Sequence, residues 1–275
     1  MGIIAGQGDA AVTMALLWAE PESRGVRPGP RPALTADTVV LAGIAVADAD
    51  TMAGLSMRTV AERLGCSSMA LYTYVPGKAE LIDLMYDRVH AELTHDHDRG
   101  RWRAAVTSWA GELRDFYVRH PWVVQVSFAR PVLGPHEQAV LETVAGILDG
   151  TGLPAGVRRG IVSLLFNYVR GAAQTVAESR QAATATGVSD QDWWASRSAR
   201  LAEVAPDFAE RFPASVRLGS DTTGTWEQRV DETFEAGLAV LLDGVSPGHR
   251  TTTGSAGRSF LITTSAARSG SASAR

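Results

Sequence analysis

Residues 55–85 read LSMRTVAERLGCSSMALYTYVPGKAELIDLM, and this stretch decides the fold. Ser56 is a favourable N-cap for a short helix, and Leu55 and Val60 occupy the two positions of a hydrophobic staple around it. Gly65 follows the helix where the chain needs a left-handed residue, which glycine adopts at the lowest cost. The pattern predicts a short helix that ends in a tight turn.

A second short helix is predicted after this turn, with Ser67 or Ser68 as its N-cap. Leu71 and Val75 are four residues apart, so both are expected to face the first helix. Pro76 ends the element, because the residue before a proline disfavours the helical conformation. Two short helices joined by such a turn form a helix-turn-helix, and the second helix fits a major groove about 12 Å wide.

The side chains outside this helix pair are small, polar or aromatic. Gly77 and Lys78 begin the next helix, where backbone N–H groups and the lysine ammonium can hold a phosphate together. Capped helices around a glycine turn also occur in three-helix units that only pack, so the pattern alone leaves that alternative open. The predicted outer face comprises Ser68, Met69, Tyr72 and Thr73.

Residues 34–93 closely resemble the N-terminal domain of the TetR family of bacterial repressors. The shared pattern is a short helix, a glycine, a recognition helix ending in Leu-Tyr-x-Tyr/His-Val, and a fourth helix that begins with lysine. Met69 departs from this family, whose members often carry proline or a small polar residue there. The resemblance implies that Tyr72 and Lys78 contact the DNA backbone and that Arg58 contacts DNA from the first helix. The DNA-facing residues it implies are Arg58, Ser67, Ser68, Met69, Tyr72, Thr73 and Lys78.

Helical periodicity runs through most of the chain, so we expect an all-α fold. The resemblance implies that it comprises a three-helix DNA-binding domain and a larger helical ligand-binding and dimerisation domain. Thr35 is a good N-cap for the first helix of the DNA-binding domain. Residues 20–32 (EPESRGVRPGPRP) are rich in Pro, Gly and Arg, and residues 246–275 are rich in Ser, Thr and Gly. The expected division is a flexible basic arm over 1–33, a helix-turn-helix domain over 34–93, an effector domain over 101–245 and a disordered tail over 246–275.

Composition limits the kinds of protein that this chain can be. Its 275 residues suffice for two domains, and the net charge of −4 argues against nonspecific coating of nucleic acid. The single cysteine, Cys66, excludes an internal disulfide and a cysteine-based zinc site. No apolar run is long enough for a membrane span and no signal peptide is evident, so we expect a cytoplasmic protein. Arg24, Arg27 and Arg31 in the arm are interpreted either as minor-groove contacts or as a solvated tail.

Large aromatic residues recur in the predicted effector domain at one or two helical turns. Such residues usually form a core, but the resemblance implies helices that enclose an apolar effector cavity, and both readings are compatible. In the helix predicted over 157–179, Asn167 and Arg170 need hydrogen-bond partners if buried, so they either orient a ligand or border a dimer interface. The predicted ligand contacts are Trp109, Phe116, Trp122, Phe128, Phe166, Asn167 and Arg170.

Two helices are expected to form a dimer interface. Small side chains in the helix over 157–179 suit close helix approach, and the segment FEAGLAVLLDG (234–244) resembles the last helix of the family, which pairs in a four-helix bundle. Two recognition helices about 34 Å apart reach successive major grooves, so a homodimer and a palindromic double-stranded operator are expected. The predicted interface residues are Ala172, Ala173, Val176, Phe234, Leu238 and Leu241.

The sequence contains no phosphate-binding loop, nucleophile elbow or His-Glu metal motif, so no catalytic residue, cofactor or metal is predicted. The tract His95, Asp96, His97 and Asp98 is interpreted as an exposed connector, with metal binding as the alternative. We expect a ligand-responsive regulator, and specifically a repressor that a small hydrophobic effector releases from DNA. The alternative function is a helical small-molecule-binding protein or enzyme with a vestigial DNA-binding domain.

Overall fold

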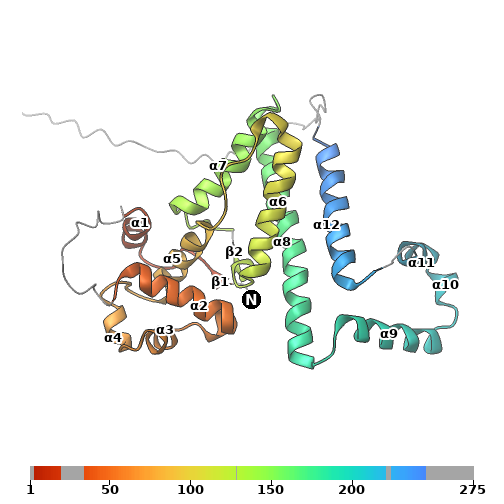
Figure 1. Ribbon diagram of the computed structural model, residues 1–275, viewed down its shortest axis with the longest axis horizontal. Coiled ribbons are helices and arrows are strands. Elements are labelled where there is room, and N and C mark those ends of the chain that lie inside the picture. Colours follow the sequence, from red (N-terminus) through yellow and green to blue (C-terminus); the bar gives the residue numbers. More distant parts are fainter. Residues whose placement is uncertain (1–2, 20–33, 128, 221–223, 246–275) are drawn as a thin grey trace, which may run out of the picture.

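The computed structural model describes residues 3–19, 34–127, 129–220 and 224–245. Its regular structure consists almost entirely of helices, which confirms the all-α prediction (Figure 1). Within the described residues, no helix has the length and apolar composition needed to cross a bilayer. The helices of the DNA-binding domain are α2 (Ala36–Gly54), α3 (Met57–Leu64), α4 (Ser68–Leu71) and α5 (Lys78–His90).

Capping contacts fix where the first helices of this domain begin. Thr35 caps α2 through a capping box with Thr38, and Ser56 caps α3 through a capping box with Thr59. Gly65 ends α3 with a φ of 66°, in the left-handed region that favours glycine. These contacts confirm the predicted caps at Thr35 and Ser56 and the predicted glycine turn.

The recognition helix α4 is shorter than the sequence pattern indicates. Only Ser68–Leu71 is helical, and a turn covers the three residues that follow. Ser67 occupies the N-cap position, but its side chain makes no capping hydrogen bond. Leu71 and Val75 are both fully buried, as their spacing predicts, so they still attach this segment to the core.

The larger domain is built around α6, which packs along α8 and against α7. Its centre is a continuous apolar core that includes Leu113, Phe116, Val144 and Leu165. Helix α12 stands beside α8 (Figure 1). The elements are η1 (Arg99–Arg101), α6 (Trp102–Arg119), η2 (Val123–Gln125), β2 (Val126–Ser127), α7 (Pro135–Asp149), α8 (Ala155–Thr186) and α12 (Trp226–Asp243).

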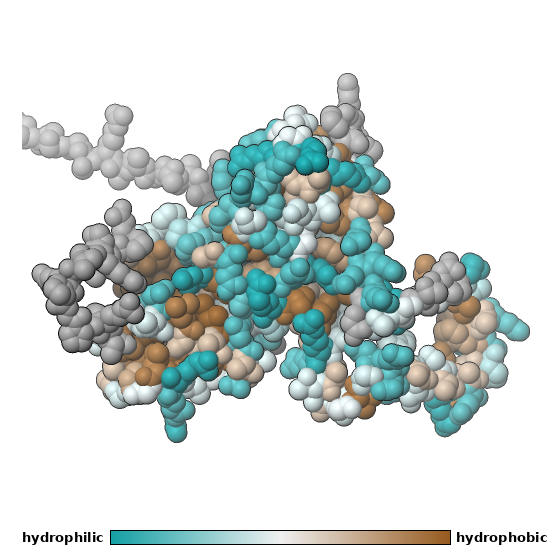
Figure 2. Space-filling view, in the orientation of Figure 1, coloured by the Kyte–Doolittle hydropathy of each residue, from teal (hydrophilic) through white to brown (hydrophobic). Residues whose placement is uncertain are grey.

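Three helices lie between α8 and α12 in the described part of the chain. They extend away from the rest of the domain and form an arm (Figure 1). None of the residues of α9 or α10 is buried, and Figure 2 shows hydrophobic surface on this arm. The arm comprises α9 (Asp190–Val204), α10 (Phe208–Arg211) and α11 (Pro213–Ser220).

The prediction of a flexible arm over residues 1–33 is wrong for its first half. Residues Ile3–Ile4 form β1, which pairs in parallel with β2, and residues Ala10–Leu17 form helix α1. The Asp9 side chain caps α1 by accepting from the Val12 N–H, and Leu17 is buried. Helix α1 packs on α5, so this segment has a surface to bury against. Arg24, Arg27, Arg31 and the predicted tail over 246–275 lie outside the described residues.

Candidate DNA interface and effector groove

The outer face of the helix-turn-helix carries the side chains that the sequence proposes for DNA contact. Met69 is 73% exposed and Tyr72 is 45% exposed, although both are large and apolar in part. Ser67 and Thr73 are also exposed, and Ser68 is half-buried. Exposed side chains on a short helix are available to the base edges of a major groove.

Two basic side chains at this face already have partners within the domain. Arg58 is largely exposed and pairs with Glu62 at 2.8 Å, four residues along α3. Lys78 donates from Nζ to the Leu55 carbonyl oxygen at 2.6 Å, so it joins the start of α5 to the residue before α3. The Arg58–Glu62 contact is exposed, so its exchange for DNA requires no unfolding, whereas Lys78 donates to a residue that is only 1% exposed. The roles of these residues in DNA binding stay a prediction.

Helix α5 connects the DNA-binding domain to the effector domain through buried carboxylates. Asp87 Oδ1 accepts from the backbone N–H groups of His136 and Glu137, each at 2.9 Å, and so caps the N-terminus of α7. Gly134 comes so close that a Cβ on it would lie 2.2 Å from Asp87 Oδ1. Burial raises the pKa of Asp87, while the two N–H donors oppose the shift.

Glu137, in the first turn of α7, belongs to the same cluster. Its Oε2 accepts from the Leu133 N–H at 2.7 Å, and Leu133 has a left-handed φ of 62°. Burial and the neighbouring Asp87 and Asp83 raise the pKa of Glu137 to about 7. A carboxyl group that titrates near neutrality therefore lies where α7 meets α5.

A second junction joins α2 to the end of α6. Asp48 Oδ1 accepts from the Trp122 indole N–H at 2.8 Å and lies 2.8 Å from His120 Nδ1. The other ring nitrogen of His120 lies 3.1 Å from Glu92, just beyond α5. Burial lowers the pKa of His120, but the hydrogen bonds to the two carboxylates outweigh it, and the pKa is raised. The segment at the end of α6 is thereby hydrogen-bonded to the DNA-binding domain.

The structure places most of the predicted ligand contacts in solid packing. Trp109, Phe116 and Trp122 are at most 3% exposed, and Trp109 meets Phe166 edge to face with ring centroids 5.2 Å apart. Arg170 donates to the carbonyl oxygens of Val124 and Val126, and Asn167 donates to the Ser163 carbonyl at 2.8 Å. Phe128 lies outside the described residues. None of the described residues among them lines either groove described below, and the role of the whole set in ligand binding stays a prediction.

A groove of about 620 Å³ lies between α6 and α12. Its apolar wall comes from Phe234, Leu238 and Leu242, and its α6 side includes Gly111. Arg114 pairs with Asp231 at 2.5 Å and lies over the Phe234 ring, 5.0 Å from its centroid. We call this the α6–α12 groove.

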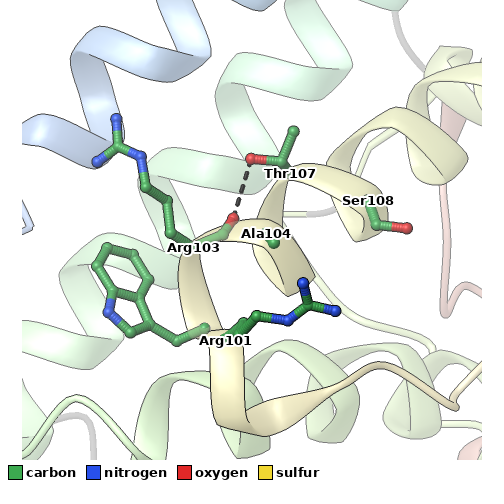
Figure 3. Close-up of a pocket in the computed structure, with 6 residues that line it drawn as sticks. Arg101, Arg103, Ala104, Thr107 and Ser108 are labelled. Carbon is green, nitrogen blue, oxygen red and sulfur yellow. Dashed lines mark hydrogen bonds between the residues drawn. The ribbon is translucent and has the colours of Figure 1, made fainter.

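The α6–α12 groove is bounded toward the start of α6 by a second ion pair. Arg103 donates to the Ala239 carbonyl oxygen at 3.1 Å and to Asp243 at 2.5 Å. A shallower hollow of about 640 Å³ adjoins this end, and in it the Arg103 and Arg101 side chains diverge (Figure 3). An apolar wall between arginine ion pairs suits an apolar ligand with acceptor groups at its edges.

The predicted dimer contacts on α12 are buried or half-buried within one chain, and their role in a dimer stays a prediction. Phe234 and Leu238 are 6% and 2% exposed because they pack within their own chain. Phe234 stacks on Tyr168, whose hydroxyl donates to the Phe234 carbonyl oxygen at 2.8 Å. Ala173 and Val176 are also buried, whereas Ala172 and Leu241 are half-buried. The exposed apolar side chains on these two helices are Leu164 and Val240, at 49% and 70%.

Sequence reasoning missed the groove and both interdomain junctions. Asp48, Asp87, His120 and Glu137 carry no local motif, and their partners lie far away along the chain. Pro135 at the first position of α7 is a helix-start signal, and an acidic residue in that turn is typical, but neither indicates a cap from α5. In the tract 95–98, His95 contacts Thr143 at 3.0 Å, and the described residues contain no cluster suited to a metal ion.

Comparison with known proteins agrees with this architecture. Residues 94–247 match the family model described as the tetracyclin repressor-like C-terminal domain. The chain is 40% identical over 244 residues to the HTH-type transcriptional repressor DrrR1 of Streptomyces coeruleorubidus, which covers 87% of each protein. It is 29% identical over 231 residues to an HTH-type transcriptional regulator of Saccharopolyspora erythraea, which covers 84% of this chain and 91% of the relative.

Among solved structures, the chain is similar to the Streptomyces coelicolor protein ActR in complex with actinorhodin. The TM-score is 0.64 with 26% identity, and the match covers 78% of this chain and 96% of ActR. ActR without ligand gives a TM-score of 0.62 at 25% identity. The likeness includes both the helix-turn-helix domain and the helical domain that follows it.

Proposed function

Because this chain belongs to the TetR family of DNA-binding, ligand-responsive transcriptional regulators, we propose that it is a repressor released from a palindromic operator by a small hydrophobic effector. The observation that carries the proposal is the capped helix-turn-helix with Met69, Tyr72 and Thr73 exposed on one face. The 40% identity to a repressor over most of both chains supports the direction of regulation.

We propose that residues 58, 67–69, 72, 73 and 78 form the DNA surface. Tyr72 and Lys78 are assigned to phosphates, because a hydroxyl and an ammonium at a helix start suit phosphate oxygens. Arg58 and Ser68 are assigned to base edges in the major groove. Arg58 then exchanges Glu62 for DNA, a change between two exposed partners.

The effector is proposed to bind the α6–α12 groove. The groove has an apolar wall, and the interior around Trp109 and Phe116 is filled by side chains. The ligand class is supported by ActR, whose structure holds actinorhodin. Entry of a ligand displaces α6 relative to α12, and His120 and Trp122 at the end of α6 carry the displacement to Asp48.

A homodimer is proposed, with an interface on the exposed faces of α8 and α12 and on the arm. Leu164 and Val240 present apolar surface on these faces. Trp193 and Trp194 of the arm are 45% and 52% exposed, and a helix without a buried face is marginal in water. In the dimer, the second copy of the chain covers the apolar side chains of the arm, α8 and α12 that are exposed in one copy.

The experiment begins with selection of DNA from a random double-stranded library by the full-length protein. We expect enrichment of an inverted repeat bound with a Kd of about 10⁻⁸ M or tighter at physiological salt. Actinorhodin is then titrated against this complex. A tenfold loss of DNA affinity means that actinorhodin binds the DNA-free protein more favourably than the DNA-bound protein by about 1.4 kcal/mol.

Gly111→Leu provides a matched test of the groove. A Cβ on Gly111 has no neighbour within 4 Å and Gly111 lines the groove, so a larger side chain there reduces the space for a ligand. The variant is expected to bind DNA normally and to lose the response to actinorhodin. If no DNA sequence is enriched while actinorhodin still binds, the alternative of a small-molecule-binding protein with a vestigial DNA-binding domain is favoured.

A further inference from the structure

Residues 3–18 cross over α5, and both of their ends are held by the effector domain. At one end β1 pairs with β2, with Ile3 opposite Val126 and Ile4 opposite Ser127. At the other end the Trp18 indole N–H donates to the Leu133 carbonyl oxygen at 3.0 Å. We call residues 3–18 the N-terminal strap.

The middle of the N-terminal strap is bound to α5 by two backbone donors. The Gly6 N–H donates to Asp83 Oδ1 at 2.9 Å, and the Asp9 N–H donates to Glu80 Oε1 at 3.3 Å. Helix α1 then packs on α5. The strap therefore contacts the DNA-binding domain between two attachments to the effector domain.

These contacts are buried, so their loss costs more free energy than the loss of exposed contacts. Asp83 is 1% exposed and Glu80 is 8% exposed, although carboxylates are seldom buried without partners. Gly8 allows the close approach, since a Cβ there would lie 2.2 Å from Glu80 Oε1. Burial raises the pKa of Asp83, and the Gly6 N–H opposes the shift. Loss of the strap would leave these carboxyl groups without their backbone donors.

We propose that the N-terminal strap is a positioning element that holds α5, and with it the helix-turn-helix, in one orientation relative to the effector domain. Glu80 and Asp83 are the positioning residues on α5. Because α5 also caps α7 through Asp87, any rotation of α5 breaks contacts on both of its sides. Any role of this orientation in the response to an effector rests on the proposed function. The test therefore measures the orientation itself, without DNA or effector.

The orientation is measured as a distance between two spin labels in the full-length chain. Labels are attached at Met69→Cys on α4 and Leu141→Cys on α7, both exposed, in a Cys66→Ser background. Labelled protein is diluted with unlabelled protein so that distances within one chain dominate. We expect one narrow distance distribution, which is lost when residues 1–19 are removed.

Point variants separate positioning from folding. Asp83→Leu removes the acceptor for Gly6 and is expected to broaden the distribution, whereas Asp83→Asn keeps an acceptor oxygen and is expected to restore it. Val12→Ser, on the exposed side of α1, is the control and should change nothing. An unchanged narrow distribution in both the truncated chain and Asp83→Leu would overturn the proposal.

A cross-link tests the strap without truncation. Paired strands lie about 4.8 Å apart, within the Cα range of a disulfide, so Ile4→Cys with Ser127→Cys should close an intrachain disulfide under mild oxidation. Asp83→Leu should still broaden the labelled distribution in the cross-linked chain, because the disulfide holds the strap to β2 and not to α5. Val12→Cys with Ser127→Cys is the control pair. If Ile4→Cys with Ser127→Cys gives no more disulfide than this control, the strand pairing on which the strap depends is contradicted.

Discussion

Glu137 gives the protein a pH dependence whose sign and size follow from its surroundings. Burial, with help from Asp87 and Asp83, raises its pKa from the ordinary value of 4.5 to about 7. Between these values the folded protein keeps a proton that the unfolded chain has lost. The Glu137 contribution to the free energy of unfolding is therefore full below pH 4.5 and falls as the pH rises through about 7.

Glu137→Gln is neutral at every pH and removes this contribution. One pKa unit corresponds to about 1.4 kcal/mol, so the difference in unfolding free energy between the wild type and the variant should change by about 2–3 kcal/mol between pH 5 and pH 8. The change favours the wild type at the lower pH. The measurement is urea unfolding of both proteins at matched ionic strength across this range.

The comparison with the variant is essential because other groups act in the opposite direction. Burial lowers the pKa of His90 to about 4, so its contribution to stability grows as the pH rises toward the ordinary value of 6.5. The two dependences partly cancel in the wild type, but His90 is common to both proteins. If the difference in unfolding free energy between the wild type and Glu137→Gln stays constant from pH 5 to pH 8, the assignment of a raised pKa to Glu137 is refuted.

Two further predictions concern the oligomer and the turn of the DNA-binding domain. Leu164→Glu combined with Val240→Glu should convert a dimer to a monomer in sedimentation velocity, while Leu141→Glu on α7 should leave it intact; equal effects would place the interface elsewhere. Gly65→Ala should lower the unfolding free energy by about 1 kcal/mol because φ is 66°, whereas Gly111→Ala within α6 should raise it by about 1 kcal/mol. Equal shifts in urea midpoint for the two alanine variants would contradict this account of the turn.

The helix-turn-helix was predictable because its signals are local. Ser56, Gly65 and Pro76 each act within a few residues, and the apolar spacing of Leu71 and Val75 specifies which side is buried. The predicted length of α4 is wrong, because the helix ends at Leu71 and a turn follows. Val75 is nevertheless buried, as its spacing from Leu71 predicts. Packing of the side chains, more than helical hydrogen bonding, fixes this segment.

The strap and the α6–α12 groove depend on contacts between distant segments. Residues 3–18 contain two glycines and an isolated apolar run, and contacts with α5, β2 and Leu133 give them a structure. Phe234 and Leu238 were predicted at a dimer interface because an apolar stripe indicates burial without naming the surface that covers it.

DNA binding by residues 55–78 is the central claim, and base-specific affinity measurements test it most directly. The selected operator and a set of its single-base variants are titrated with wild type, Arg58→Ala, Ser68→Ala, Tyr72→Ala and Lys78→Ala. We predict that the tyrosine and lysine variants weaken binding to every sequence alike, while the arginine and serine variants reduce discrimination by about 1–3 kcal/mol at particular base pairs. Wild-type affinity and base preference in all four variants would contradict the claim that this helix-turn-helix reads DNA.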